Sequence, residues 1–123
     1  MTKSHDERDK WVLRLSQSLG LNPFDQDWGI QNSDPQRLDE FLSFFESHET
    51  KHPWDFEELA DLIFESANDK LLTSGMSSAE KFLLCRFVEK NFKLFPLRAS
   101  YWSGLFGNAE FPVAELIHPY VAC

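Results

Sequence analysis

Signals that start and stop α-helices recur along the whole chain, while the alternating patterns of β-strands are nearly absent. Ser77 and Glu80 have the spacing of a capping box, in which each side chain bonds the other residue's backbone amide. Ser4 and Glu7 form a second such pair, and four prolines fit a first helical position: Pro35, Pro53, Pro96 and Pro112. Three glycines are expected to end helices: Gly20, Gly75 and Gly107. These signals predict an all-α fold with five or six helices.

Apolar residues follow the helical period between these signals. Leu38, Phe41, Leu42 and Phe45 stand at i, i+3, i+4 and i+7, which is the spacing of a single buried face. The segments 53–72 and 77–95 predict two further helices. In the first, the residues expected in the hydrophobic core are Phe56, Leu59, Ala60, Ile63, Ala67 and Leu71. In the second, they are Leu83, Leu84, Cys85, Phe87 and Val88. In the second of these helices, we expect the basic residues Arg86, Lys90 and Lys93 to face outward.

Two stretches lack a helical signal of their own. Residues 21–32 predict an ordered loop anchored by Phe24, Trp28 and Ile30, and residues 1–5 form a polar start that is a candidate for disorder. A last turn or two follows Pro112 and is expected to end before His118. With 123 residues, the chain has the length of one domain, so we assign residues 1–123 to a single compact unit.

The charge balance narrows the class of partner. The formal net charge is −8, and residues 25–69 carry thirteen acids against two bases, whereas residues 70–98 carry six bases against two acids. Nucleic acids and anionic membranes are bound mainly through basic side chains, so both are disfavoured and a basic protein is favoured. Two cysteines, a polar N-terminus and the lack of a long apolar run indicate a cytoplasmic protein.

Carboxylates at helical spacing form the predicted partner-binding surface. Glu58, Asp61, Glu65 and Asp69 fall within about 80° of arc, opposite the apolar face of the helix over 53–72. Asp39 and Glu46, from the preceding helix, are expected to extend this stripe. The alternative interpretation of such a run is a solvated helix face without a partner.

One string has the form of a zinc-peptidase motif. His48, Glu49 and His52 read H-E-x-x-H, in which two histidines hold the metal and the Glu is the general base. Pro53 disfavours helical geometry at His52, so we interpret the string as a linker between two helices. We therefore predict no catalytic residue, no metal site and no cofactor. Phe82, beside Arg86, is expected either to pack under residues 21–32 or to anchor a partner; Phe44 is treated in the same way.

Three segments resemble a family of small bacterial immunity proteins, which bind and block one cognate toxin. They span roughly residues 25–105: Asp27-Trp28-Gly29-Ile30 with Ser33-Asp34-Pro35-Gln36-Arg37-Leu38-Asp39-Glu40-Phe41-Leu42-Ser43-Phe44-Phe45-Glu46, Leu59-Ala60-Asp61-Leu62-Ile63-Phe64-Glu65-Ser66-Ala67-Asn68-Asp69, and Tyr101-Trp102. The chain departs from the family pattern at the H-E-x-x-H string, which extends a short helix connection. The resemblance implies binding without catalysis.

Taken together, these features predict a non-enzymatic immunity protein that covers a basic surface of a toxin, such as a nuclease, with its acidic face. Two alternatives stay open at this point: a small zinc-dependent hydrolase that uses the H-E-x-x-H string, and a helical adaptor domain. The sequence leaves the toxin and the oligomeric state undetermined.

Overall fold

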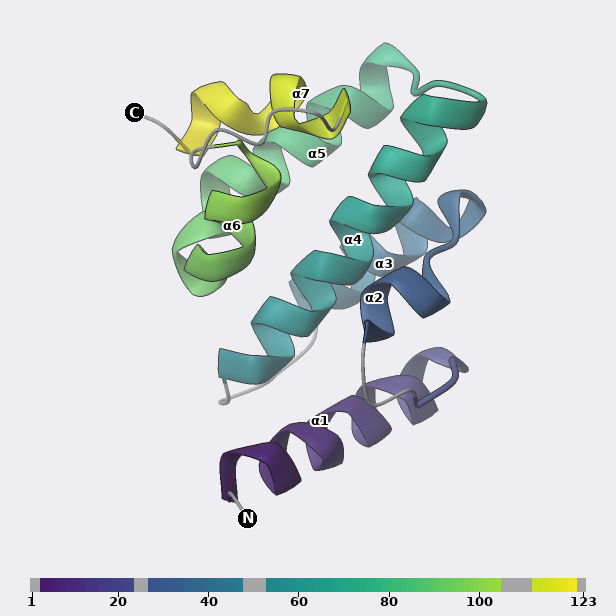
Figure 1. Cartoon of the computed structure of the whole chain (residues 1–123). Helices are drawn as coiled ribbons and strands as arrows, with labels where there is room; N and C mark the ends of the chain where they lie inside the picture. The colour runs from purple at the N-terminus through teal and green to yellow at the C-terminus, as the bar shows by residue number, and fades with distance from the viewer. Residues whose placement is uncertain (1–2, 24–26, 48–52, 105–111, 122–123) are drawn as a thin grey trace.

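A computed structural model describes residues 3–23, 27–47, 53–104 and 112–121, and these residues are almost entirely helical (Figure 1). Within these ranges there are seven α-helices and two short 3₁₀-helices, and no strand. Their bounds are as follows: α1 Lys3–Leu19, α2 Trp28–Asn32, η1 Pro35–Arg37, α3 Leu38–Ser47, α4 Pro53–Thr73, α5 Ser78–Asn91, η2 Phe92–Leu94, α6 Pro96–Trp102 and α7 Pro112–Val121. The predicted all-α class is confirmed, with slightly more helices than expected.

Helix α4 is the central element. It contacts α1, α2 and α3 as well as α6 and α7, and in Figure 1 it runs through the middle of the molecule. The apolar residues in its middle are fully buried, with Leu59, Leu62, Ile63 and Phe64 inaccessible to solvent, whereas Phe56 and Leu71 nearer its ends are only partly buried. Because other helices surround α4, residues on most of its sides are buried, and not only those on its apolar face.

Aromatic rings join the helices that pack around α4. The ring centroids of Phe45 and Phe87 lie 4.9 Å apart in an edge-to-face arrangement. Phe95 stacks on Phe87 at 5.3 Å and meets Phe64 at 5.8 Å. Such pairs add about 0.5–1.5 kcal/mol each beyond the burial of their surface. One hydrophobic core therefore connects α3, α4, α5 and the start of α6.

Polar side chains of α4 hold the beginnings of neighbouring helices. Glu57 accepts hydrogen bonds from the backbone amides of Leu97, at 3.2 Å, and Arg98, at 3.0 Å. Asn68 accepts one from the amide of Val113 at 3.3 Å. The first amides of a helix lack partners within it, so these α4 side chains stabilise the N-termini of α6 and α7.

Helices α1 and α2 are joined through a buried hydrogen-bond chain. The indole Nε1 of Trp28 donates to the Ser16 hydroxyl at 2.7 Å, and that hydroxyl donates to the Val12 carbonyl at 2.7 Å. Gly29 lies so close to α4 that a Cβ atom there would stand 2.8 Å from Asp61 Oδ2. Position 29 therefore has no room for a side chain, and α2 packs directly on α4.

Several local expectations were wrong. The expected loop over 21–32 contains helix α2, and Ile30 is 52% exposed and therefore no anchor; Phe24 lies outside the described residues. Ser4 lies inside α1, because that helix begins at Lys3. Helix α7 continues through Pro119 to Val121, although a proline removes one backbone hydrogen bond from a helix.

Other local expectations were confirmed. Ser77 and Glu80 form the predicted capping box at the start of α5, with both reciprocal bonds present. Trp28 and Cys85 are buried as expected, and Arg86, Lys90 and Lys93 face outward. None of the described helices has the length and apolar character needed to span a bilayer.

Candidate functional site

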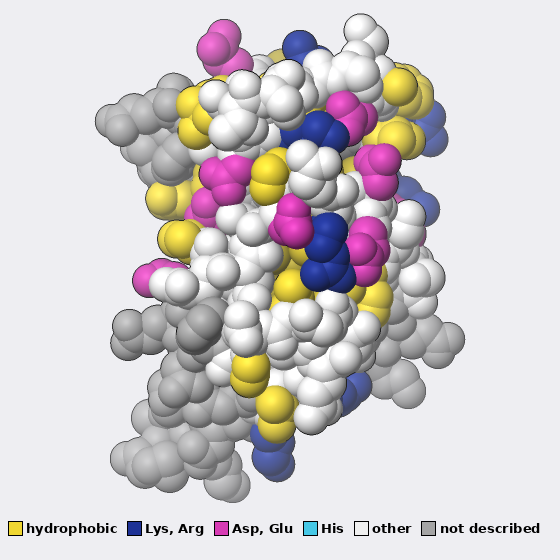
Figure 2. Space-filling view, turned by 90° about the vertical axis from the view of Figure 1, so that its right-hand side faces the viewer, with side chains coloured by type: hydrophobic (Ala, Val, Ile, Leu, Met, Phe, Trp, Pro, Cys, Tyr) yellow, Lys and Arg dark blue, Asp and Glu magenta, His cyan; other side chains and the backbone are white. Residues whose placement is uncertain are grey.

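The six carboxylates predicted to form one stripe are divided among three environments. Glu58 is buried in the core, whereas Asp61, Glu65 and Asp69 lie half-buried along α4. Asp39 and Glu46 are exposed on α3. The expectation of one continuous, solvent-facing stripe was therefore wrong, because neighbouring helices cover much of the polar side of α4. On the face drawn in Figure 2, acidic and basic side chains are likewise interspersed.

Glu58 is the clearest correction. Its side chain is 1% exposed, and its Oε2 lies 3.9 Å from Arg98 Nη2 on α6. A carboxylate this deeply buried needs such a partner, since an isolated buried charge is strongly destabilising. Glu58 is therefore a structural residue that helps to hold α6 on α4, and we remove it from the partner-binding set.

Asp61 combines a structural role with partial exposure. Its Oδ1 accepts a hydrogen bond from the Trp102 indole at 2.9 Å and lies 3.5 Å from Arg98 Nε. Its Oδ2 faces Gly29 on α2. Asp61 thus stands where α2, α4 and α6 meet.

Four carboxylates gather at the junction of α2 and α4, and we call Asp27, Asp61, Glu65 and Asp69 the acidic cluster. Asp27 is exposed and precedes the first residue of α2, where it adopts a left-handed backbone with φ of 51°. Asp69, one turn beyond Glu65, accepts a hydrogen bond from the Ser33 hydroxyl at 2.7 Å. Three of the six predicted residues, Asp61, Glu65 and Asp69, are thus brought together. Asp27 also belongs to the acidic cluster, and the helical period could not reveal it because Asp27 lies outside α4.

The electrostatics of the acidic cluster are visible at Glu65. Burial, and to a lesser extent repulsion from Asp61, Asp69 and Asp27, together raise the pKa of Glu65 from 4.5 to about 7. A carboxyl group with such a pKa is close to half-protonated at neutral pH. The neighbouring carboxylates thus add to the effect of burial in disfavouring the ionised form of Glu65, and a cation placed beside Glu65 would favour that form.

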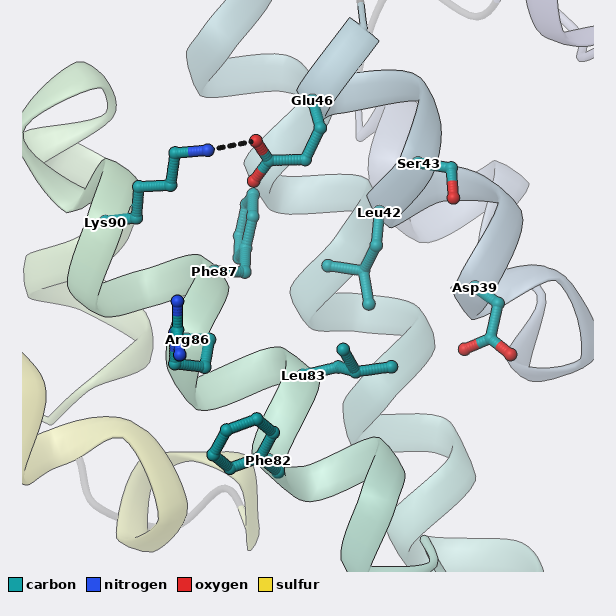
Figure 3. Close-up of a pocket in the computed structure, with 9 residues that line it drawn as sticks. All are labelled: Asp39, Leu42, Ser43, Glu46, Phe82, Leu83, Arg86, Phe87 and Lys90. Atoms are coloured by element: carbon teal, nitrogen blue, oxygen red, sulfur yellow. Dashed lines mark hydrogen bonds and ion pairs between the residues drawn. The ribbon is translucent and has the colours of Figure 1, made fainter.

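Asp39 and Glu46 belong to a different surface. They form one wall of an open hollow of about 750 Å³ between α3 and α5, which we call the α3–α5 groove (Figure 3). The groove is lined by nine residues: Asp39, Leu42, Ser43, Glu46, Phe82, Leu83, Arg86, Phe87 and Lys90.

The α3–α5 groove has apolar side chains at its base and on one wall. Phe82 is 60% exposed and Leu83 is 50% exposed, so neither packs into the core. The expectation that Leu83 is buried was wrong, as was the interpretation of Phe82 as a residue under the 21–32 segment. The i, i+4 pairing of Phe82 with Arg86 was the available sequence signal, and the Arg86 guanidinium lies 5.7 Å from the ring centroid. Phe44, by contrast, packs against the core.

The H-E-x-x-H string of His48, Glu49 and His52 lies outside the described residues. Among the residues that are described, no group of three His, Cys, Asp or Glu side chains is placed to hold a metal ion. Cys85 is buried, and burial raises the pKa of its thiol, which disfavours the nucleophilic thiolate.

Residues behind the family resemblance have structural roles here. The Asp34 amide donates to the Ser66 hydroxyl at 3.0 Å, and the Asp34 side chain accepts from the Gln36 amide. Arg37 binds both carboxylate oxygens of Glu40 and also donates to the Leu19 carbonyl. These bonds hold η1 against α1 and α4, so Asp34 and Arg37 act in the packing of η1.

Comparisons with known proteins add no further assignment. No family model, curated protein or solved structure matches this chain.

Proposed function

We propose that this protein is a non-enzymatic inhibitor of the immunity type, which binds a cognate bacterial toxin through the acidic cluster. The observation that carries the proposal is the convergence of Asp27, Asp61, Glu65 and Asp69 at the junction of α2 and α4. Three of these residues belong to the surface expected from the sequence. The resemblance to immunity proteins supplies the class of partner.

The chemistry of the acidic cluster suits a basic partner. Carboxylates that lie close together speed the encounter with a positive surface and favour its docking. A nuclease fits as the toxin, because its active site must be basic to hold phosphates. A Lys or Arg from that surface, placed beside Glu65, would favour the ionised carboxylate and remove the repulsion that raises its pKa.

The proposal predicts a gene for a toxin domain immediately upstream of this one, and the test begins with that domain. We expect the purified domain to bind the protein in a one-to-one complex and to lose its activity on titration. The double variant Asp27→Asn/Glu65→Gln replaces two carboxyl groups of the acidic cluster by amides with little change in shape, and asparagine tolerates the left-handed backbone of Asp27. Its association rate should fall by about tenfold at low salt, with a weaker dependence on salt.

The matched control is Glu89→Gln/Glu115→Gln. Both residues are exposed and lie on α5 and α7, away from the acidic cluster, and the number of carboxyl groups replaced is the same. This control should bind at close to the wild-type rate. Equal rates for both double variants would assign the effect to net charge alone, and the absence of a toxin gene beside this one would contradict the proposal itself.

A further inference from the structure

The two walls of the α3–α5 groove carry opposite charges. Asp39 and Glu46 stand on α3, and Arg86 and Lys90 stand on α5, so the groove is locally neutral although the chain has a net charge of −8. In Figure 3, Asp39 lies across from Arg86, and Glu46 lies across from Lys90. A locally neutral groove does not favour the basic partner proposed for the acidic cluster.

The charged residues at one end of the groove pair with each other, and those at the other end do not. Glu46 accepts hydrogen bonds from Lys90 at 3.0 Å and from Asn91 at 2.9 Å, which closes one end. At the other end, neither Asp39 nor Arg86 takes part in an ion pair within the described part of the chain. Leu83 points between them in Figure 3, and Phe82 lies beside Arg86.

We propose that the occupant of the α3–α5 groove is a second copy of this chain, which makes the protein a two-fold symmetric dimer. In such an interface the same patch is used on both subunits, so the patch must complement itself. A two-fold axis along the groove lays the α3 wall of each copy on the α5 wall of the other. Asp39 of each copy then faces Arg86 of the other copy, so this contact occurs twice. The exposed apolar residues of α5 are covered near the axis.

The alternative orientation is disfavoured by the same charges. A two-fold axis across the groove would lay α3 on α3 and α5 on α5, and would bring acid against acid and base against base. Like charges placed together in an interface cost several kcal/mol. Charge complementarity thus selects one orientation, with opposed walls, and that orientation defines the residue pairs for a test.

The size of the groove determines how strongly we expect the two copies to associate. A stable interface has about 20–30 residues on each side, and the groove offers nine lining residues and their neighbours. The net charge of −8 on each copy also opposes association. We therefore expect a dimer that dissociates on dilution in the micromolar range, measured by sedimentation velocity between about 1 and 500 μM.

Charge reversal tests the proposal most sharply. Asp39→Arg and Arg86→Glu each place like charges together at both Asp39–Arg86 contacts between the subunits, so each variant alone should be monomeric at 100 μM. Mixed in equal amounts, the two variants should associate again, because both inter-subunit pairs then become complementary. The matched controls Glu89→Arg and Lys93→Glu, exposed on α5 and η2 but outside the groove, should dimerise like the wild type.

Replacing the apolar contact provides a second, independent variant. Phe82→Ser removes an exposed ring, so the circular dichroism spectrum and the unfolding midpoint should stay near the wild-type values while the dimer is lost. Three results would overturn the proposal: a wild-type protein that stays monomeric up to 500 μM, a dimer that is unaffected by the groove variants, or mixed variants that fail to associate. Each of them leaves the toxin-binding proposal untouched.

Discussion

Replacing Glu65 by Gln should stabilise the protein at neutral pH and not at acidic pH. In the folded protein, burial and the carboxylates of Asp61, Asp69 and Asp27 raise the pKa of Glu65 from 4.5 to about 7. The folded state therefore favours the protonated carboxyl group. Its contribution to stability is fully present below about pH 4.5 and is lost as the pH rises through about 7.

The magnitude follows from the size of that change. A pKa raised by about 2.5 would correspond to about 3 kcal/mol for a fully buried group, at about 1.36 kcal/mol per pH unit. Because Glu65 is only half-buried, solvent screening reduces the figure to about 1–2 kcal/mol. Glutamine keeps the shape and lacks the charge, so Glu65→Gln should be about 1–2 kcal/mol more stable than the wild type at pH 7.5, with little difference at pH 4.5.

Urea unfolding, followed by circular dichroism at pH 4.5, 6.0 and 7.5, measures this difference directly. Glu89→Gln is the control, because Glu89 is an exposed carboxylate outside the acidic cluster. Its stability relative to the wild type should be nearly constant across the pH range. A Glu65→Gln stability difference that also stayed constant with pH would refute the idea that the acidic cluster is electrostatically strained.

Three further predictions concern the fold. Glu57→Gln leaves one of the two α6 amides without its carboxylate acceptor and should lower the unfolding free energy by about 1–3 kcal/mol in urea titrations. Gly29→Ala forces a Cβ atom against Asp61 and should cost about 1–3 kcal/mol, seen as a lower thermal midpoint. If the H-E-x-x-H string is a linker, His48→Ala/His52→Ala should leave the thermal midpoint within about 2 °C, and elemental analysis of the wild type should find no stoichiometric zinc.

Much of the helical architecture could be predicted because its signals are local. The capping pair of Ser77 and Glu80 and the prolines at helix starts act within one turn, so the sequence contains the whole interaction. The apolar spacing of Leu38, Phe41, Leu42 and Phe45 likewise predicted the buried face of α3, and all four residues are buried.

The burial of the α4 carboxylates could not be predicted from the same kind of signal. Helical period shows which face of α4 is apolar, but it does not show whether other helices cover the polar face. Here α2 and α6 do so, and they bring Arg98 to Glu58 and two helix-start amides to Glu57. Those partners lie about forty residues away along the chain, where no local pattern reveals them.

The α3–α5 groove illustrates the opposite error. Leu83 continues an apolar run with Leu84, and the period alone predicts that both are buried. Helix α5 turns Leu84 into the core and leaves Leu83 at the edge of the groove, 50% exposed. An exposed apolar residue beside charged walls is a tertiary feature, and it became visible only when α3 and α5 were placed together.

Proton release on toxin binding tests the central claim, that a basic partner docks on the acidic cluster. Calorimetric titration of the upstream-encoded toxin domain at pH 7, in buffers of different ionisation enthalpy, counts the protons exchanged. We expect the wild type to release about half a proton more than Glu65→Gln, because a docked cation ionises a carboxyl group whose pKa is about 7 in the free protein. Equal proton release by the two proteins would show that the toxin binds elsewhere, and would contradict the account.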